Sequence, residues 1–391
     1  MKFPYARPVI SNEDLKLVNL VLKEQYLSGG RFIKKFEEDI KKKFDSKYAV
    51  VCNSGTAALH LVYSSLGIKK GSCILTSPIT FLATANAARL LGAEVIFADI
   101  DPNTGLLTAQ SIENKLMKIK KKVNVITVVH LGGRVCDMKN IHKVAKKYGC
   151  YLVEDACHAP GAHFMDTTSK NKIKVGSCKY SNASTFSFHA IKHVTMGEGG
   201  CITTNNKKLA YNSKLLLNHG MVKEKKYFHN KGKVPLWYYE CQKLGWNYRA
   251  SDINCALGIS QLKKLNKNIK KRFDLVNVYK EEFKDQDNLT IPENSYKFSN
   301  AWHLFSINLD LKKIKKTKDQ IARMLLKKSI GTQVHYIPIF LHPLFKKKYK
   351  TSNYKNTISY YKKTLSLPLY TSLQKNDIKY IASEVKKIIN N

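Results

Sequence analysis

The chain has 391 residues, 43% hydrophobic and 10% aromatic, a composition typical of a globular protein large enough for two domains. No apolar run approaches the roughly 20 residues that span a bilayer, and the amino terminus lacks the apolar core of a signal peptide, so we expect a cytoplasmic protein. The nine cysteines are odd in number and form no Cys-x-x-Cys pair, which argues against a disulfide framework and a zinc site.

The net charge is extreme, because 67 basic residues face 29 acidic ones and give +38. One interpretation is a nucleic-acid or anionic-membrane partner. The lysines occur as short runs along the whole chain, however, and not as one stripe interleaved with aromatic residues. We therefore favour a lysine-rich surface with no nucleic-acid or membrane partner, whose field helps to gather a polyanionic small substrate.

Residues 11–45 are expected to form two helices. Ser11 is a helix cap followed by acidic residues, and residues 26–30 interrupt the pattern. The second helix begins near Arg31, and its apolar residues recur every four positions at Phe32, Phe36, Ile40 and Phe44.

From Tyr48 onward, short apolar runs alternate with helical stretches, which predicts an α/β sheet. Strands are expected at 49–52, 74–75, 95–98, 123–130, 151–155, near 184–188 and at 200–204. Helices are expected at 57–66, up to residue 91, after residue 138 and at 207–218.

The remainder of the chain has a different composition. Residues 222–245 are polar and aromatic and are expected to form a long loop, and a long helix follows from Ile253. Beyond it we expect strands at 304–309 and 333–336 and helices near 317–328 and 374–389. We therefore divide the chain into a large domain at 1–250, whose first 25 or so residues pack on the small domain, and a connecting helix with a small α+β domain at 251–391.

Three features of the large domain have a chemical interpretation. Asn53–Thr56 is a small-residue loop between a strand and a helix, where backbone N–H groups and the helix dipole favour phosphate, although many such turns bind nothing. Asp155 ends a strand and needs a partner if buried; the alternative is a helix N-cap. Lys192 stands alone in an apolar segment closed by the turn Gly197–Gly200, where desolvation would lower the pKa of its amine. The alternative for Lys192 is a surface lysine beside a turn.

Together these three features fit pyridoxal phosphate (PLP) chemistry, which needs an amine nucleophile, a carboxylate for the pyridinium nitrogen and a phosphate site. At this point the sequence resembles the DegT/DnrJ/EryC1/StrS sugar aminotransferases. The resemblance implies PLP fold type I, the aspartate aminotransferase-like fold, with a mixed, mostly parallel sheet in a large domain and a smaller α+β domain. The motifs that carry the resemblance are Asn53–Leu59, Glu154–Ala159, Ser187–Lys192 with Gly197–Gly200, Gly245–Arg249 and Ser366–Tyr370.

The resemblance also implies roles for single residues. Lys192 would hold PLP as a Schiff base and then act as the general base and acid of the proton shift. Asp155 would pair with the pyridinium nitrogen. His158 would bond the ring hydroxyl, although a core histidine is the alternative, and Phe81 would stack on the ring, although a plain core residue is the alternative.

The same resemblance implies a phosphate site and a dimer. Gly55, Thr56 and Ser187 match the phosphate contacts. Asn247 matches a phosphate contact from the neighbouring subunit, and Arg249 would reach the substrate across the same interface, so we expect a homodimer with shared active sites. No metal is implied.

Five stretches have a narrower resemblance: residues 78–86, 187–192, 218–221, 260–264 and 333–339. They resemble the transaminases of pseudaminic acid synthesis, which implies glutamate as amino donor and C4 of a UDP-linked 4-keto-6-deoxy sugar as acceptor. His335 and Tyr336 are expected to contact this substrate; the alternative is a buried edge strand. The rivals are another nucleotide-sugar aminotransferase, acting at C3 or on a dTDP- or GDP-linked 4-keto sugar, a PLP-dependent sugar dehydratase, and a basic nucleic-acid-binding protein.

Overall fold

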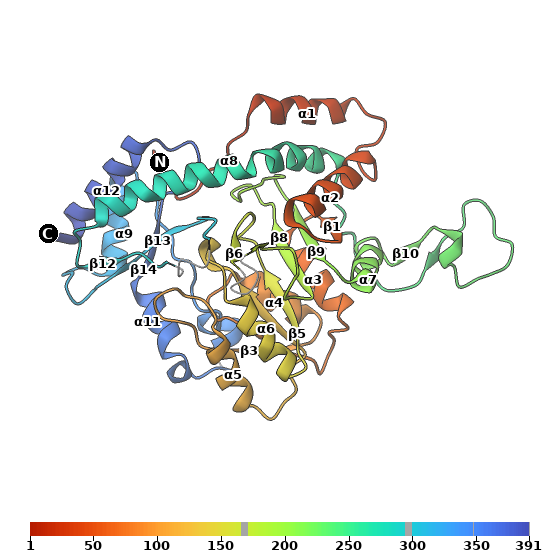
Figure 1. The fold of residues 1–391 in the computed structure, drawn as a ribbon, viewed down its shortest axis with the longest axis horizontal. Helices are drawn as coiled ribbons and strands as arrows, with labels where there is room; N and C mark the ends of the chain where they lie inside the picture. Colours follow the sequence, from red (N-terminus) through yellow and green to blue (C-terminus); the bar gives the residue numbers. More distant parts are fainter. Residues whose placement is uncertain (166–170, 294–298, 347, 391) are drawn as a thin grey trace.

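A seven-stranded sheet forms the centre of the computed structural model, which describes residues 1–165, 171–293, 299–346 and 348–390 (Figure 1). The strand order is β1-β9-β8-β5-β4-β2-β3. Strand β9 is antiparallel to both of its neighbours, and every other pair is parallel. The bounds are β1 (Tyr48–Cys52), β2 (Cys73–Thr76), β3 (Glu94–Phe97), β4 (Val125–Val129), β5 (Tyr151–Asp155), β8 (Ala183–Ser187) and β9 (Gly200–Thr204).

Helices cover both faces of this sheet because its strands are apolar on both sides. In β1, Val50 packs into one hydrophobic cluster, whereas Ala49 and Val51 pack into another, as the alternation of a strand requires. The Val50 side is covered by α3 (Gly55–Ser65), α4 (Leu82–Leu90) and α7 (Lys207–Leu217). The opposite side is covered by α2 (Arg31–Phe44), α5 (Ala109–Met117), α6 (Met138–Lys147) and the first half of α8 (Asp252–Phe283).

Helix α8 runs from the large sheet to a separate, smaller hydrophobic cluster (Figure 1). Helix α1 (Asn12–Leu22) lies along it, and Phe3 pairs with Ile330 of the smaller unit. That unit contains the sheet β12 (Leu289–Thr290), β13 (Phe305–Leu309) and β14 (Thr364–Leu367), with α9 (Lys318–Lys327) and α12 (Lys375–Asn390). Helices α10 (Pro343–Lys346) and α11 (Lys355–Lys363) instead place Phe345 and Tyr360 in the clusters of the large sheet. The two clusters support a domain boundary near residue 250, which stays a prediction.

The segment after α7 projects away from the body of the molecule (Figure 1). It is a hairpin of β10 (Met221–Val222) and β11 (Glu240–Cys241), with a 3-10 turn at Lys225–Tyr227. Val222 and Phe228 are buried in a small cluster with Leu215, whereas three apolar side chains of the segment are in solvent: Leu236 is 100% exposed, Trp237 81% and Leu244 91%. The predicted long loop therefore contains short strands, which its polar composition concealed.

Most predicted elements are present, and the α/β class with a mixed, mostly parallel sheet and a smaller α+β part is confirmed. The strand predicted at 333–336 is wrong, because this stretch makes only an isolated bridge between Gln333 and Ser366. Helices α5 and α11 and the hairpin of β6 (His163–Met165) and β7 (Lys172–Lys174) were not predicted. Within the described residues, no helix combines the length and the apolar character needed to cross a membrane.

Candidate active site

A cavity of about 760 Å³ lies at the carboxyl ends of the parallel strands. The segments that follow β1, β2, β5 and β8 each contribute to its wall, because parallel strands end at the same edge of a sheet. The smaller unit closes the cavity from the other side with residues 303 and 333–337. Nine of the predicted site residues line it: Gly55, Thr56, Phe81, Asp155, His158, Ser187, Lys192, His335 and Tyr336.

Lys192 is partly buried in this cavity, in the turn that follows β8. Its Nζ lies 3.5 Å from Nε2 of His303. Burial lowers the pKa of the Lys192 amine, although the nearby Cys157 and Asp155 oppose the shift. A lowered pKa increases the fraction of neutral, nucleophilic amine near pH 7. The alternative interpretation, a surface lysine beside a turn, does not describe this environment.

Asp155 is the last residue of β5 and is only 6% exposed. Oδ2 accepts a hydrogen bond of 2.7 Å from the Thr84 hydroxyl, and Oδ1 accepts one of 3.3 Å from the Cys157 N–H. These contacts fix the carboxylate at the floor of the cavity. No helix begins at Asp155, so the alternative of an N-cap is wrong.

His158 is buried and held at both ring nitrogens. Nδ1 accepts a hydrogen bond of 3.2 Å from the Gly132 N–H, so the ring proton is on Nε2, which lies 3.1 Å from the Tyr336 hydroxyl. Burial and the nearby Lys192 hold the pKa of His158 well below its usual value. The neutral ring therefore presents an N–H donor to the cavity.

The N-terminus of α3 forms the part of the cavity next to β1. The Ser54 hydroxyl caps this helix by accepting from the Ala57 N–H at 3.1 Å. A Cβ on Gly55 would lie 2.9 Å from Cβ of Ser187 and 3.3 Å from Sγ of Cys157, so the start of α3 packs against Ser187 more closely than a side chain at this position would allow. Free backbone N–H groups and the helix dipole make this a suitable position for an anion.

Phe81, His335 and Tyr336 also contribute rings to the wall of the cavity. Phe81 is 59% exposed, and its ring centroid lies 6.1 Å from that of Tyr336. Phe81 is therefore not a plain core residue. His335 is buried, and its Nδ1 lies 2.9 Å from the Ser366 hydroxyl, but neither His335 nor Tyr336 belongs to a strand, so the edge-strand alternative is wrong.

His303 lines the cavity but was not predicted. It is 4% exposed, and its ring lies 4.5 Å from that of His158 and 5.2 Å from that of His193. Its backbone N–H donates to the Gly132 carbonyl at 3.0 Å, which ties the smaller unit to the sheet. Nothing in the local sequence indicates this position, because the contact with Lys192 joins residues 111 positions apart.

Asn247 and Arg249 do not line the cavity within one chain. Asn247 is exposed and pairs with Asn218 in an isolated bridge, and the Arg249 guanidinium donates to the Asn218 side chain. Both lie between the projecting hairpin and α8. The structure of one chain therefore leaves their predicted roles across a subunit interface as predictions.

Comparison with known proteins identifies similar chains of nearly the same length. The model of the DegT/DnrJ/EryC1/StrS aminotransferase family matches residues 8–386. A Campylobacter jejuni protein named UDP-4-amino-4,6-dideoxy-N-acetyl-beta-L-altrosamine transaminase is 38% identical over 98% of this chain and 97% of its own length. The Bacillus subtilis spore coat polysaccharide biosynthesis protein SpsC is 36% identical over 99% of this chain and 97% of its own. The structure of Helicobacter pylori PseC, an aminotransferase of pseudaminic acid biosynthesis, superposes with a TM-score of 0.89 at 32% identity and covers 99% of each chain.

Proposed function

The chain belongs to the DegT/DnrJ/EryC1/StrS aminotransferase family, and we propose that it is a PLP-dependent enzyme that transfers an amino group from glutamate to C4 of a UDP-linked 4-keto-6-deoxy sugar. The product would enter the synthesis of pseudaminic acid or a related surface glycan. The observation that carries the proposal is the position of Lys192, which lies in one cavity with the buried Asp155 and the N-terminus of α3. The cytoplasmic location stays a prediction.

The residues of the cavity fit PLP by their chemistry. The Lys192 amine has a lowered pKa, as the attachment of an aldehyde requires. The buried Asp155 carboxylate would pair with the ring nitrogen, and the Nε2 proton of His158 would face the ring oxygen. The N-terminus of α3, which the absence of a Cβ on Gly55 keeps close to Ser187, would hold the phosphate.

PLP, when bound, supplies an electron sink that stabilises negative charge on the carbon next to the amino group. The chain would then do three things. Lys192 would carry the proton between that carbon and the cofactor, because burial lowers the pKa of its amine and so favours the neutral, basic form. Asp155 would keep the ring nitrogen protonated, and Phe81 would cover one face of the ring.

We also propose that the enzyme is a homodimer with shared active sites. The projecting hairpin exposes Leu236, Trp237 and Leu244 to solvent, and large apolar side chains in this state are typical of an interface. Asn247 and Arg249 follow the hairpin and do not line the cavity of their own chain. Their donation to the cavity of the partner would account for both observations.

The identity of the sugar is the finer part of the proposal. Similarity to SpsC is almost as high as similarity to the C. jejuni transaminase, so a nucleotide-sugar aminotransferase of another polysaccharide pathway is the second candidate. Gln333–Ile337 and Tyr361, which line the cavity opposite the sheet, would distinguish the two substrates.

The experiment is a substrate screen with ¹⁵N-glutamate and 4-keto-6-deoxy sugars linked to UDP, dTDP or GDP. We expect ¹⁵N in the product amine and release of 2-oxoglutarate with the UDP sugar, with lower kcat/KM for the others. A preference for a dTDP or GDP sugar would support the second candidate. Release of water from the sugar without ¹⁵N incorporation would support a dehydratase and contradict the proposal.

A further inference from the structure

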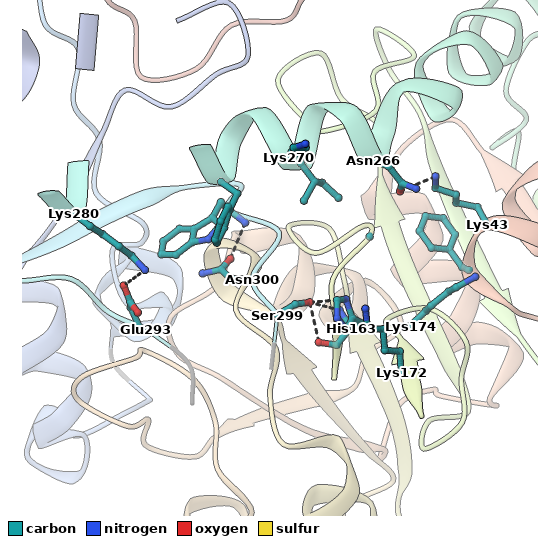
Figure 2. Close-up of a pocket in the computed structure, with 15 residues that line it drawn as sticks. Lys43, His163, Lys172, Lys174, Asn266, Lys270, Lys280, Glu293, Ser299 and Asn300 are labelled. Carbon is teal, nitrogen blue, oxygen red and sulfur yellow. Dashed lines mark hydrogen bonds and ion pairs between the residues drawn. The ribbon is translucent and has the colours of Figure 1, made fainter. Parts of the chain in front are cut away.

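A second cavity of about 670 Å³ shares no lining residue with the candidate active site (Figure 2). It lies between the middle of α8, the β6–β7 hairpin and the end of α2. Ser299, Asn300 and Trp302 form part of its wall, whereas the next residue, His303, lines the active site. We call it the basic cavity because of the residues that line it.

The described wall of the basic cavity carries five lysines and a single carboxylate. Glu293 is paired with Lys280 at 2.6 Å, at one end of the cavity (Figure 2). Among the described residues, the side-chain ammonium groups of Lys172, Lys174 and Lys270 have no hydrogen-bond or ion-pair partner. The fifth lysine, Lys43, donates to the Asn266 side chain at 2.9 Å. The positive charge of the cavity is therefore largely uncompensated.

The lysines also act on one another. Burial, and then the charge of Lys174, lower the pKa of Lys43. Burial, and then the charge of Lys172, lower the pKa of His163. Figure 2 shows Lys43, Lys172 and Lys174 gathered at one end of the cavity, with Lys270 on the helix above. A bound anion would reduce this mutual repulsion, although Lys172, Lys174 and Lys270 are exposed and therefore partly screened by solvent.

Asn300 adds an observation that does not depend on charge. Its Oδ1 accepts from the Trp302 N–H at 2.7 Å, but its Nδ2 is buried and has no hydrogen-bond partner in the described part of the chain. Leaving a buried donor unsatisfied costs about 1–3 kcal/mol. This nitrogen has almost no accessible surface, so an acceptor in the cavity would satisfy it only after the Asn300 side chain turns toward the cavity. Phe44, Ile269 and Phe273 supply apolar wall beside the charged groups.

We propose that the basic cavity is a second binding site, for a small molecule that carries a diphosphate group. Its volume falls within the range of about 300–1,000 Å³ that ligand sites occupy. Lysine ammonium groups from β7 and α8 would bind the phosphate oxygens as point charges, and the Asn300 amide would donate to another oxygen. The apolar wall would accept a planar group attached to the diphosphate.

The test is isothermal titration of the PLP-loaded protein with pyrophosphate. We expect saturable binding by the wild type, and a Kd at least about tenfold higher for the double variant Lys172→Gln/Lys174→Gln, which removes two of the unpaired charges. Lys143→Gln/Lys146→Gln is the matched control, because it makes the same change of charge at exposed positions on α6 and should leave the Kd unchanged.

Asn300→Asp is the second variant. It keeps the acceptor for the Trp302 N–H and adds a negative charge to the wall of the cavity, so we expect weaker pyrophosphate binding than in the wild type, measured below the unfolding temperature of the variant. Titration with ADP separates the sources: a lower Kd than for pyrophosphate identifies a nucleotide, and an equal Kd identifies the diphosphate group alone. Equal affinity of wild type and Lys172→Gln/Lys174→Gln for pyrophosphate would overturn the proposal, since binding would then lie at the active site or on the general surface.

Discussion

At the residue scale, burial shifts the pKa values of the ionisable side chains in the candidate active site. Lys192 has a lowered pKa, and His158 and His303 are neutral because burial holds the pKa of each ring well below its usual value. The cavity therefore combines one amine that has a lowered pKa with two histidine rings that stay neutral. This arrangement suits a lysine that must take up and release a proton near pH 7.

Gly55 tests the phosphate position at this scale. We expect Gly55→Ala to weaken PLP binding by about tenfold or more, because its Cβ would meet Ser187 at 2.9 Å and displace the end of α3 by enough to lose a charge-assisted hydrogen bond. The measurement is PLP affinity from absorbance titration of the apoenzyme. Gly232→Ala, on the exposed hairpin, is the control and should bind PLP as the wild type does; equal weakening in both variants would contradict the assignment.

Local sequence predicted the residues that lie beside the strand ends and missed those contributed by distant segments. Asp155 and Lys192 were predictable because Asp155 ends an apolar strand, Lys192 lies in the turn after another, and parallel strands end at one edge of the sheet. His303 was not predictable, since it reaches the cavity from the smaller unit through a contact with Lys192. Tyr336 was predicted by resemblance, but not the hydrogen bond that joins it to His158.

At the scale of elements, a buried pair links neighbouring strands of the large sheet. The Cys136 N–H donates to Nδ1 of His130, which follows β4, and Nε2 of His130 lies 2.9 Å from Oε2 of Glu154 in β5. The other oxygen of Glu154 accepts from Ser181 and Ser184. Every polar atom of the pair is satisfied, so the two strand ends are held in a fixed position below the cavity.

We expect Glu154→Ala to reduce the free energy of unfolding by about 3–5 kcal/mol, because it leaves the buried His130 and both serines without their acceptor. Urea unfolding at pH 7 measures this change. Glu38→Ala, which removes the exposed pair with Lys41, should cost less than about 1 kcal/mol. Similar values for the two variants would show that the buried pair has no structural role.

Elements that contain a regular pattern of apolar residues were predicted from the sequence, whereas elements of two or three residues were missed. Helix α2 and strand β5 carry regular patterns of apolar residues and were found close to their bounds. The β6–β7 hairpin has three residues in each strand, and β10–β11 has two, which is too few for a period to be visible. The stretch 333–336 looks like a strand, but His335 and Tyr336 face the cavity and make no ladder.

At the scale of the whole molecule, buried neutral histidines should make the fold sensitive to acid. Burial lowers the pKa of His193 and of His335 to about 3, below the unfolded value of 6.5. Unfolded chains bind these protons first, so the stability present above pH 6.5 is lost as the pH falls toward 3. Each ring then contributes a loss of about 1.4 kcal/mol per pH unit.

We expect the free energy of unfolding to decrease by about 2.4 kcal/mol from pH 6 to pH 5 through these two rings, because the unfolded rings are still only partly protonated at pH 6. Urea unfolding at several pH values measures the slope. His193→Gln places an amide nitrogen where Nε2 of His193 faces the Ala301 carbonyl, and His335→Asn places an amide group where Nδ1 of His335 faces the Ser366 hydroxyl. The double variant should flatten the slope between pH 6 and pH 5. An unchanged slope in that variant would assign the acid sensitivity to other groups.

The exposed hairpin tests the proposed dimer. We expect Leu236→Ser/Trp237→Ser to shift the protein toward monomer in light scattering after size-exclusion chromatography, because the variant removes two almost fully exposed apolar side chains. The same variant should lose transaminase activity, since Asn247 and Arg249 would no longer reach the cavity of the partner. An active monomer would contradict the shared site.

The most direct test of the account is the absorbance spectrum of the protein with PLP, before and after addition of glutamate, for wild type and Lys192→Ala. We expect the wild type to bind PLP with an absorption band that glutamate converts to that of the pyridoxamine form. Lys192→Ala should fail to complete this conversion, because it lacks the amine that moves the proton. Complete conversion by Lys192→Ala at the wild-type rate, or a wild type that does not respond to any amino donor, would contradict the central role of Lys192.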